Sequence, residues 1–185
     1  MSFMVCFLPG MSRQLNLYTD KNEIVEKELV QLRNQISEAN SAEKIEQLSE
    51  VLAEYPQLNN MQTDHFKLTG LYMRKVVIEK GQIIVGKIHK KEHFVVIAKG
   101  KFGVSTNHGV QQIYEAGDII VSDPDVQRVV VGLETGVFLT VHRTDAETLE
   151  QIKDDLMQSP KIDLYDANNM LKDPQLAYER RKELK

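Results

Sequence analysis

Three basic side chains, Lys87, His89 and His93, stand close together between two apolar segments. Imidazole nitrogens bind transition metals and exchange protons near neutral pH, and an ammonium group attracts anions. Apolar and polar residues alternate in both flanking segments, which is typical of β-strands. With a period of two, Lys87 and His89 share one face, and His93 begins a face of the next strand. If both faces look into one closed sheet, the three side chains converge at its mouth.

A metal centre is one chemistry that these residues allow. His89 and His93, with His142 from the last predicted strand, would offer three neutral nitrogen ligands to iron, manganese, nickel or zinc. The alternation around His142 leaves open which face of its strand it takes. Lys87 argues against a metal, because two like unit charges about 4 Å apart, at an effective dielectric near 20, repel by about 4 kcal/mol.

An anion-binding pocket is the alternative chemistry. Lys87 and Arg128, if both face inward, would polarise the pocket positively and suit a carboxylate or a phosphate. Glu92 and Glu134 would then orient imidazoles or balance the charge. The charge argument favours this small anionic organic ligand over a catalytic metal. The residues that we expect to bind the ligand are Lys87, His89, His93, Arg128, Glu92, Tyr72 and Arg74.

The spacing of these residues resembles the first motif of the cupin family. Gly81, five residues, Lys87-x-His89, three residues, His93, six residues and Gly100 match that motif throughout. Lys87 stands where the family has a histidine, and His93 stands where it has a glutamate. A looser likeness to the second cupin motif covers residues 117–128 and puts an arginine near its histidine position.

A longer set of residues is similar to small cupin-like proteins common in bacteriophage genomes, over roughly residues 55–157. The shared features are His65-Phe66, Gly70-x-Tyr72-x-Arg74, His89-Lys90-x-Glu92-His93, Arg128-Val129, Glu134 and Thr140-Val141-His142. The resemblance implies a double-stranded β-helix, or jelly-roll, barrel that pairs through its sheets as a homodimer or a larger homo-oligomer. If the chain is phage-encoded, the cytoplasm in which we expect it is that of the host.

Three kinds of function are compatible with the resemblance, since cupin folds host many chemistries. The first is a phage-type protein that binds a small ligand, for example a signalling molecule in a phage–host interaction. The second is a metal-dependent enzyme of the oxygenase or isomerase type, or a metal-free isomerase with His89 or His93 as general base. The third is a structural or assembly protein with a vestigial pocket.

The composition and the net charge argue against some classes of partner. The chain has 185 residues, a net charge of −4 and a single cysteine, Cys6. The acidic balance argues against a nucleic-acid partner, and one cysteine excludes an internal disulfide and fits a reducing cytoplasm. The sequence has no stretch of about 20 apolar residues, so we predict no membrane span. It also lacks a glycine-rich phosphate loop and a Gly-x-Ser-x-Gly nucleophile elbow.

Short strands without intervening helices predict a sandwich or a barrel. We predict a mainly β fold, a cupin-type jelly-roll barrel with an N-terminal helical hairpin and C-terminal helices. The expected parts are an N-terminal tail over 1–19, the hairpin over 20–56, the barrel over 57–144 and C-terminal helices over 145–185. The expected strands cover 71–79, 82–89, 93–106, 110–115, 118–122, 127–133 and 137–143, and residues 57–70 are expected to form turns.

Capping patterns predict where three helices begin. Asn40 with Glu43 is expected to open the second helix of the hairpin, and Thr144 with Glu147 is expected to open the first helix after the barrel. Asp173-Pro174 is placed to open a last helix.

Overall fold

The computed structural model describes residues 4–7, 34, 36, 38–53, 57, 61–158 and 162–173. The predicted helix over 20–39 and the predicted last helix after residue 173 therefore lie almost entirely outside the described residues. Within the described part of the chain, no helix combines the length and the apolar character that crossing a membrane requires.

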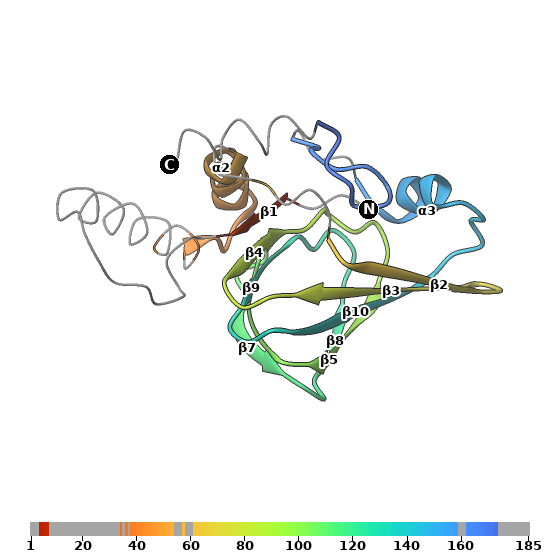
Figure 1. Cartoon of the computed structure of the whole chain (residues 1–185), viewed down its shortest axis with the longest axis horizontal. Coiled ribbons are helices and arrows are strands. Elements are labelled where there is room, and N and C mark those ends of the chain that lie inside the picture. Colours follow the sequence, from red (N-terminus) through yellow and green to blue (C-terminus); the bar gives the residue numbers. More distant parts are fainter. Residues whose placement is uncertain are drawn as a thin grey trace.

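The described strands form two five-stranded antiparallel sheets that face each other (Figure 1). The first sheet has the order β1 (Met4–Phe7), β4 (Gln82–Val85), β9 (Arg128–Gly132), β6 (Lys101–Thr106) and β7 (Gln111–Glu115). The second sheet has the order β2 (Thr63–Leu68), β3 (Leu71–Ile78), β10 (Gly136–Arg143), β5 (His93–Lys99) and β8 (Ile119–Ser122). From β3 to β10 the chain crosses repeatedly between the sheets, leaving four of these eight strands in each. This arrangement is a jelly roll, and it confirms the predicted fold class.

Four of the predicted segments differ from the structure by more than a residue at an end. The predicted strand over 93–106 is two strands, β5 and β6, because Gly100 between them has a φ of +83° and turns the chain. The predicted strand over 82–89 ends at Val85, so His89 lies in the following loop. Residues 63–68, predicted to be turns, form β2, and residues 4–7 of the predicted tail form β1. The sequence of β2 is polar because it is an edge strand with no fully buried side chain.

The space between the sheets is filled by side chains that alternate along the strands. Apolar residues of both sheets form one buried cluster, in which the rings of Phe102 and Phe138 meet edge to face. The buried members of this cluster are Met61, Val76, Ile78, Ile84, Val95, Ile97, Phe102, Val104, Val130 and Phe138. The cluster fixes the distance between the sheets and forms the floor of the cavity described below.

Helix α2 (Ala42–Ala53) covers the outer face of the first sheet (Figure 1). Its apolar stripe packs against strands β4 and β9 in a second cluster, whose buried members are Ala39, Ile45, Leu48, Leu52, Ile83, Val85 and Val129. The helix itself is confirmed, but its predicted cap is wrong. The backbone N–H of Lys44 donates to Oγ of Ser41, the residue before the helix, rather than to Asn40.

Helix α3 (Leu149–Leu156) closes one end of the barrel (Figure 1). Its capping box joins Thr148 and Gln151, so the predicted pair of Thr144 and Glu147 is wrong. The Thr144 hydroxyl instead donates to Oδ2 of Asp155 and holds the helix against the end of β10. The buried face of α3 packs on Tyr72 of strand β3 and so covers the barrel beside the histidines.

Gly136, the first residue of β10, lies against Lys99 and Phe102, and a substitution there tests how closely β10 packs on these residues. A methyl group at Gly136 would overlap the carbonyl oxygen of Lys99 and lie 2.7 Å from Cζ of Phe102. We expect Gly136→Ala to lower the free energy of unfolding by about 2 kcal/mol, because a packed core does not accept an added group without strain. At Gly103 on β6 the nearest atom is 4.0 Å away, so Gly103→Ala is the matched control and should cost nothing. Urea unfolding of both variants measures the difference, and equal stabilities would contradict the described packing.

Candidate metal centre

Two of the three histidines come from neighbouring strands of the second sheet. The register pairs Val141 of β10 with Phe94 of β5, so the adjacent positions His142 and His93 stand side by side on the inner face. Thr140 is the next residue of β10 on this face, and it is also buried. The open question about His142 is therefore answered, since its side chain points into the barrel.

The third histidine, His89, lies in the loop between β4 and β5, and backbone hydrogen bonds hold this loop on both sides. Towards one side, the N–H of His89 donates to the carbonyl of Val126, and the N–H of Asp125 donates to the carbonyl of His89 at 2.7 Å. Towards the other side, the N–H of Lys90 donates to the carbonyl of Leu156 at the end of α3. His89 is thus held as firmly as a strand residue, although the strand has ended.

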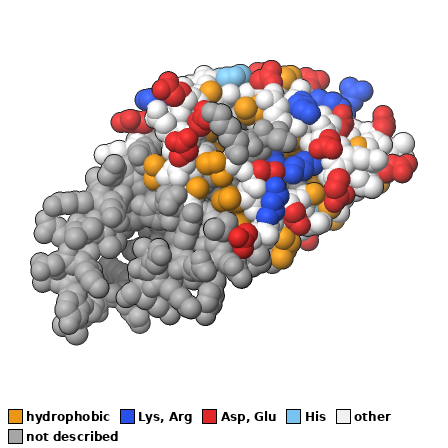
Figure 2. Space-filling view, turned by 90° about the horizontal axis from the view of Figure 1, so that it is seen from above, with side chains coloured by type: hydrophobic (Ala, Val, Ile, Leu, Met, Phe, Trp, Pro, Cys, Tyr) orange, Lys and Arg blue, Asp and Glu red, His pale blue; other side chains and the backbone are white. Residues whose placement is uncertain are grey.

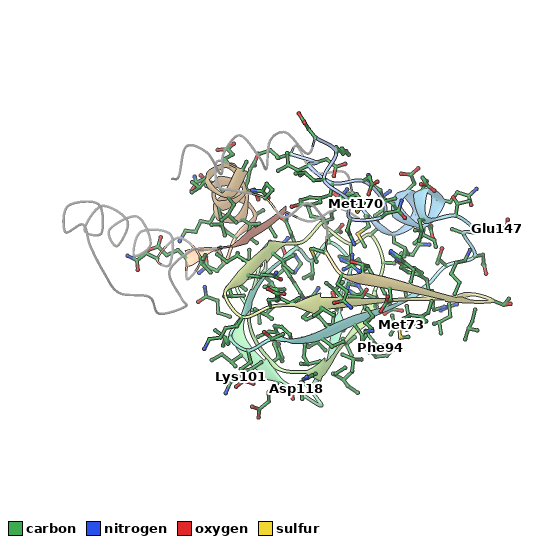
Figure 3. All side chains as sticks on the ribbon, viewed as in Figure 1. Met73, Phe94, Lys101, Asp118, Glu147 and Met170 are labelled. Carbon is green, nitrogen blue, oxygen red and sulfur yellow. The ribbon has the colours of Figure 1, made fainter. Side chains whose placement is uncertain are left out.

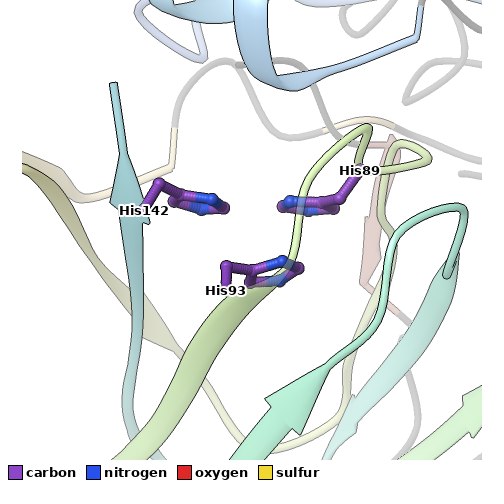
Figure 4. Close-up of side chains that lie close together, drawn as sticks. All are labelled: His89, His93 and His142. Atoms are coloured by element: carbon purple, nitrogen blue, oxygen red, sulfur yellow. The ribbon is translucent and has the colours of Figure 1, made fainter. Parts of the chain in front are cut away.

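The three imidazoles face one another at the end of the barrel (Figure 4). One nitrogen from each of His89, His93 and His142 lies within 4.8 Å of the other two. The exposed fractions of these residues are 6%, 5% and 1%. Nδ1 of His89, Nε2 of His93 and both ring nitrogens of His142 are buried without a hydrogen-bond partner. Buried polar atoms normally have partners, and the grouping of these nitrogens is one that could hold a metal ion.

All three imidazoles are uncharged near neutral pH. Burial, reinforced by the neighbouring imidazoles and guanidinium groups, lowers the pKa of His89 well below its ordinary value. Burial likewise lowers the pKa of His93 to about 4 and that of His142 to about 2. The neutral ring is the form that binds a metal. Nδ1 of His93 lies 3.2 Å from the carbonyl oxygen of Lys91, and a hydrogen bond from Nδ1 would leave Nε2 as the ligand atom.

The three rings fit a transition-metal ion in number and in donor type. Metal–nitrogen bonds of about 2.0–2.1 Å place two ligands of a tetrahedral ion about 3.3 Å apart. The described nitrogens, within 4.8 Å of one another, would reach this spacing by small rotations of the side chains. Three protein ligands also leave at least one coordination position for another molecule.

A cavity of about 40 Å³ adjoins the histidines. One water molecule needs a cavity of about 10–15 Å³, so this cavity holds a group of only a few atoms. Apolar side chains of the core form most of its wall. The described residues that line it are Met61, Arg74, Val76, Ile78, Ile84, Gly86, Lys87, His89, His93, Val95, Arg128, Val130, Phe138 and Thr140. None of these residues is acidic.

Two buried guanidinium groups give the cavity its positive charge. Arg74 is 2% exposed and Arg128 is 8% exposed. Burial lowers the pKa of Arg74 to about 10 and also lowers that of Arg128, but both remain charged at neutral pH. Both groups lie close enough to His89 and His93 to lower the pKa of these imidazoles. A negative group in the cavity would therefore meet two cations beside the histidines.

Lys87 lines the cavity, but its charge is directed to a carboxylate on the C-terminal segment. Its Nζ lies 3.0 Å from Oδ1 of Asp163, and the lysine is only 2% exposed. Lys153 and Lys172 bind the other oxygen of Asp163, at 3.2 Å and 3.0 Å. Burial lowers the pKa of Lys87 to about 8, and Asp163 opposes that shift. Because Asp163 compensates the charge of the Lys87 ammonium group, the repulsion between Lys87 and a metal ion no longer argues against a metal site.

The remaining predicted site residues lie outside the cavity wall. Glu92 is exposed, next to His93 in the sequence but pointing to solvent. Tyr72 is fully buried, stacks beside His142 at 6.2 Å between ring centres and hydrogen-bonds to Nδ1 of His65 at 2.7 Å.

Seen from the side of α2, basic and acidic side chains are interspersed on the described surface (Figure 2).

Sequence reasoning missed Asp163 and Thr140. Asp163 lies far along the chain from Lys87, and no spacing pattern connects them. Thr140 carried a signal, because it shares the alternation of His142 and must lie on the same face.

No protein-family model matches the chain, and no curated protein matches it. Solved structures similar to it include an RmlC-like cupin from Shewanella frigidimarina, with 20% identity over 46% of this chain and 78% of that one, and a TM-score of 0.42. An RmlC-like cupin family protein from Methanocaldococcus jannaschii has 13% identity over 48% and 84%, with a TM-score of 0.41. A cupin 2 conserved barrel domain protein from Salinispora arenicola has 15% identity over 52% and 87%, with a TM-score of 0.42.

The ion pair of Lys87 and Asp163 gives a prediction about stability. Asp163→Asn would leave a buried ammonium group uncompensated, and we expect it to cost about 3 kcal/mol of unfolding free energy. Lys172→Gln is the matched control, because this lysine is 46% exposed and its pair with Asp163 is worth less than about 1 kcal/mol.

The double variant Lys87→Met and Asp163→Asn removes both charges and should recover most of the loss. Urea unfolding of the four proteins makes the comparison. A double variant no more stable than Asp163→Asn alone would show that Asp163 acts through its other contacts.

Proposed function

We propose that this chain binds a divalent transition-metal ion at His89, His93 and His142, and a small anionic ligand in the adjoining cavity. The observation that carries the proposal is the set of buried imidazole nitrogens that face one another without partners. Imidazole is a preferred ligand of zinc, iron, nickel and copper. Because the three rings are neutral, they bind a cation without first losing a proton.

The metal and the two arginines would act on the same ligand. A bound ion would supply Lewis acidity and a coordination position that the three imidazoles do not occupy. Arg74 and Arg128 line that cavity, and guanidinium groups hold carboxylates and phosphates through paired hydrogen bonds. The apolar walls would receive the non-polar part of the ligand. These features favour a small organic acid over a large or a cationic molecule.

An enzyme and a simple binding protein would use such a site differently. An oxygenase or an isomerase would use the open coordination position, whereas a carrier or a sensor would only hold the ligand. A phage–host role, with a small signalling molecule as the ligand, rests on the resemblance to phage-encoded cupin-like proteins alone. A structural protein with a vestigial pocket is the rival hypothesis, and it requires that no metal and no anion bind.

The metal proposal predicts the metal content of protein purified without a histidine tag. We expect about one equivalent of metal per chain, and at least a hundredfold weaker binding in His142→Ala, because two imidazoles alone hold an ion poorly. Elemental analysis and titration with zinc measure both quantities. His108→Ala is the control, since His108 is exposed in the turn between β6 and β7.

Equal zinc binding by the wild type and by His142→Ala would overturn the metal site. Loss of zinc binding in His108→Ala as well would mean that the assay detects surface histidines.

The anion proposal predicts ligand-dependent thermal stabilisation of the metal-loaded protein. Acetate and inorganic phosphate serve as probes of the two anion classes, and a ligand that binds only the folded state raises the melting temperature. We expect Arg128→Gln to weaken the effect of at least one probe about tenfold, since a charge-assisted hydrogen bond is worth about 1.5–3 kcal/mol. Lys101→Gln on β6 is the control, because this lysine pairs with Glu115 and does not line the cavity. Equal responses of the two variants would remove Arg128 from the site.

A further inference from the structure

Residues 162–173 cross the end of the barrel at which the three histidines lie. In Figure 1 this segment, drawn in blue, lies over the barrel between α2 and α3. At its start, Ile162 and Leu164 pack with α2 against the first sheet. Further along, the side-chain amide of Asn169 donates to the hydroxyl of Thr63 at 2.9 Å, and Thr63 begins edge strand β2 of the second sheet. The segment therefore connects the two sheets across this end of the barrel, and we call it the strap.

Two polar ties of the strap end on residues that line the cavity. Oδ1 of Asp163 lies 3.0 Å from Nζ of Lys87. The Thr63 hydroxyl, which accepts from Asn169, donates in turn to the carbonyl of Met61 at 3.0 Å. Lys87 and Met61 both belong to the cavity wall, and they are 2% and 5% exposed. The strap is thus tied to the wall of the cavity itself rather than to a distant part of the barrel.

The strap is folded as a small unit of its own. The N–H of Lys172 donates to the carbonyl of Leu164, and Tyr165 and Leu171 pair in a β-bridge, so the strap is a hairpin. Tyr165 and Leu171 are buried in a small apolar cluster of the strap, and Leu164 packs both on this cluster and on the one beneath α2. Because much of its apolar contact is internal, the hairpin can move relative to the barrel without losing its own core.

The ion pair of Asp163 and Lys87 is the strongest polar tie of the strap. Lys153 of α3 also contacts Asp163, at 3.2 Å, whereas Lys172 belongs to the strap itself and does not attach it to the barrel. Lys87 is the most deeply buried of the three lysines, and water screens a buried charge less than an exposed one. We call the pair of Asp163 and Lys87 the latch.

Helix α3, the other cover of this end, is held to the loop between β4 and β5 by backbone hydrogen bonds. The N–H of Lys90 donates to the carbonyl of Leu156, and the N–H of Gln158 donates to the carbonyl of Ile88. The apolar face of α3 also packs around Tyr72 of the barrel. The two ties of the strap run through side chains, and such contacts break and form again without disrupting a helix or a sheet. Of the two covering elements, the strap is therefore the one that can move.

The histidines and the cavity wall are buried, so a ligand reaches them only after part of the cover moves. We infer that the strap is a gate, which opens when Asp163 separates from Lys87 and closes when this ion pair forms again. The inference concerns access to the site of the proposed function, and it rests on that function for the class of ligand, a small anion. An anion that approaches Lys87 meets the ammonium group that holds Asp163, so it competes with the strap and favours its own entry.

Oxidation of Met61 by hydrogen peroxide measures access to the cavity. Peroxide is small, and a methionine thioether reacts with it to give the sulfoxide and water. Met170, which lies on the strap above the barrel (Figure 3) and is 46% exposed, is the internal reference. Peptide mass spectrometry of the full-length protein in the presence of EDTA follows both residues. In the wild type, Met61 should react at least about tenfold more slowly than Met170, because only the open gate exposes it.

The double variant Lys87→Met and Asp163→Asn removes the latch without leaving a buried charge unpaired. We expect Met61 to oxidise about tenfold faster in this variant than in the wild type, with the reference unchanged. Lys75→Met with Asp64→Asn is the matched control. It removes an ion pair of 2.7 Å by the same substitutions, on β2 and β3 and outside the strap, and it should leave Met61 slow.

Asn169→Gly tests the second tie. Glycine accepts the φ of +60° found at Asn169 but lacks the amide that donates to Thr63. Because one hydrogen bond to the second sheet is lost, we expect Met61 to oxidise about threefold faster than in the wild type.

Amide hydrogen exchange establishes whether the barrel stays folded, since the amides of β3 and β10 must remain protected in each variant. Equal rates at Met61 in the wild type and in the latch variant would overturn the inference, and so would a wild-type Met61 as reactive as Met170. Faster oxidation together with lost protection in β3 and β10 would assign the effect to unfolding and would also overturn it.

The peroxide reaction needs neither a metal nor an anion, so the two proposals can fail separately. A protein whose latch variant exposes Met61 but whose wild type binds no zinc would support the gate and contradict the proposed function. A wild type that binds zinc, with Met61 equally slow in all variants, would support the metal site and contradict the gate.

Discussion

Three imidazoles can share one dry site only if all of them are uncharged, and the end of this barrel is built around that constraint. A proton on any of the rings would create a charge out of water, beside Arg74 and Arg128, which are already positive. Burial and electrostatics thus act in the same direction. The neutral rings have free lone pairs that can bind a cation, and the guanidinium groups of Arg74 and Arg128 make the adjoining cavity favourable for an anion.

The arrangement assigns the two kinds of basic group to different tasks. The imidazoles are close together because neutral rings do not repel one another, and they stack at distances of 4.1–5.1 Å between centres. The arginines remain charged and stand on the cavity wall among apolar side chains. Lys87 is the exception, since its ammonium group turns to Asp163 and leaves the imidazoles without a third neighbouring cation.

Much of the fold could be predicted because the responsible signals are local. The predicted strands coincide with β3 and β7 to β10 to within one residue at each end. These strands are short and are separated by turns, such as the one between β6 and β7, where Gly109 has a φ of +85°. Edge strand β2 escaped prediction, because a strand with little buried surface needs no apolar alternation. The cap of α3 was wrong because Thr144 and Thr148 both fit the pattern, and tertiary contacts decided between them.

The site was less predictable because it joins segments that are distant in sequence. His89 and His93 stood out through their spacing within one motif. The face of His142 depended on which side of β10 meets the core, which alternation alone does not specify. Glu92 and Glu134 were expected to orient imidazoles or balance the charge of the pocket. Both are exposed instead, Glu92 in the loop before β5 and Glu134 in the bend before β10.

The ion pair between Lys87 and Asp163 also makes substitutions at the two positions interdependent. A lysine buried at this place in the barrel is tolerable only while a distant segment supplies a carboxylate, so a neutral residue at position 163 costs stability as long as residue 87 is charged. A neutral side chain at residue 87 would not need an acid at residue 163. The tolerance of the C-terminal segment to mutation thus depends on the side chain that occupies position 87 of the barrel.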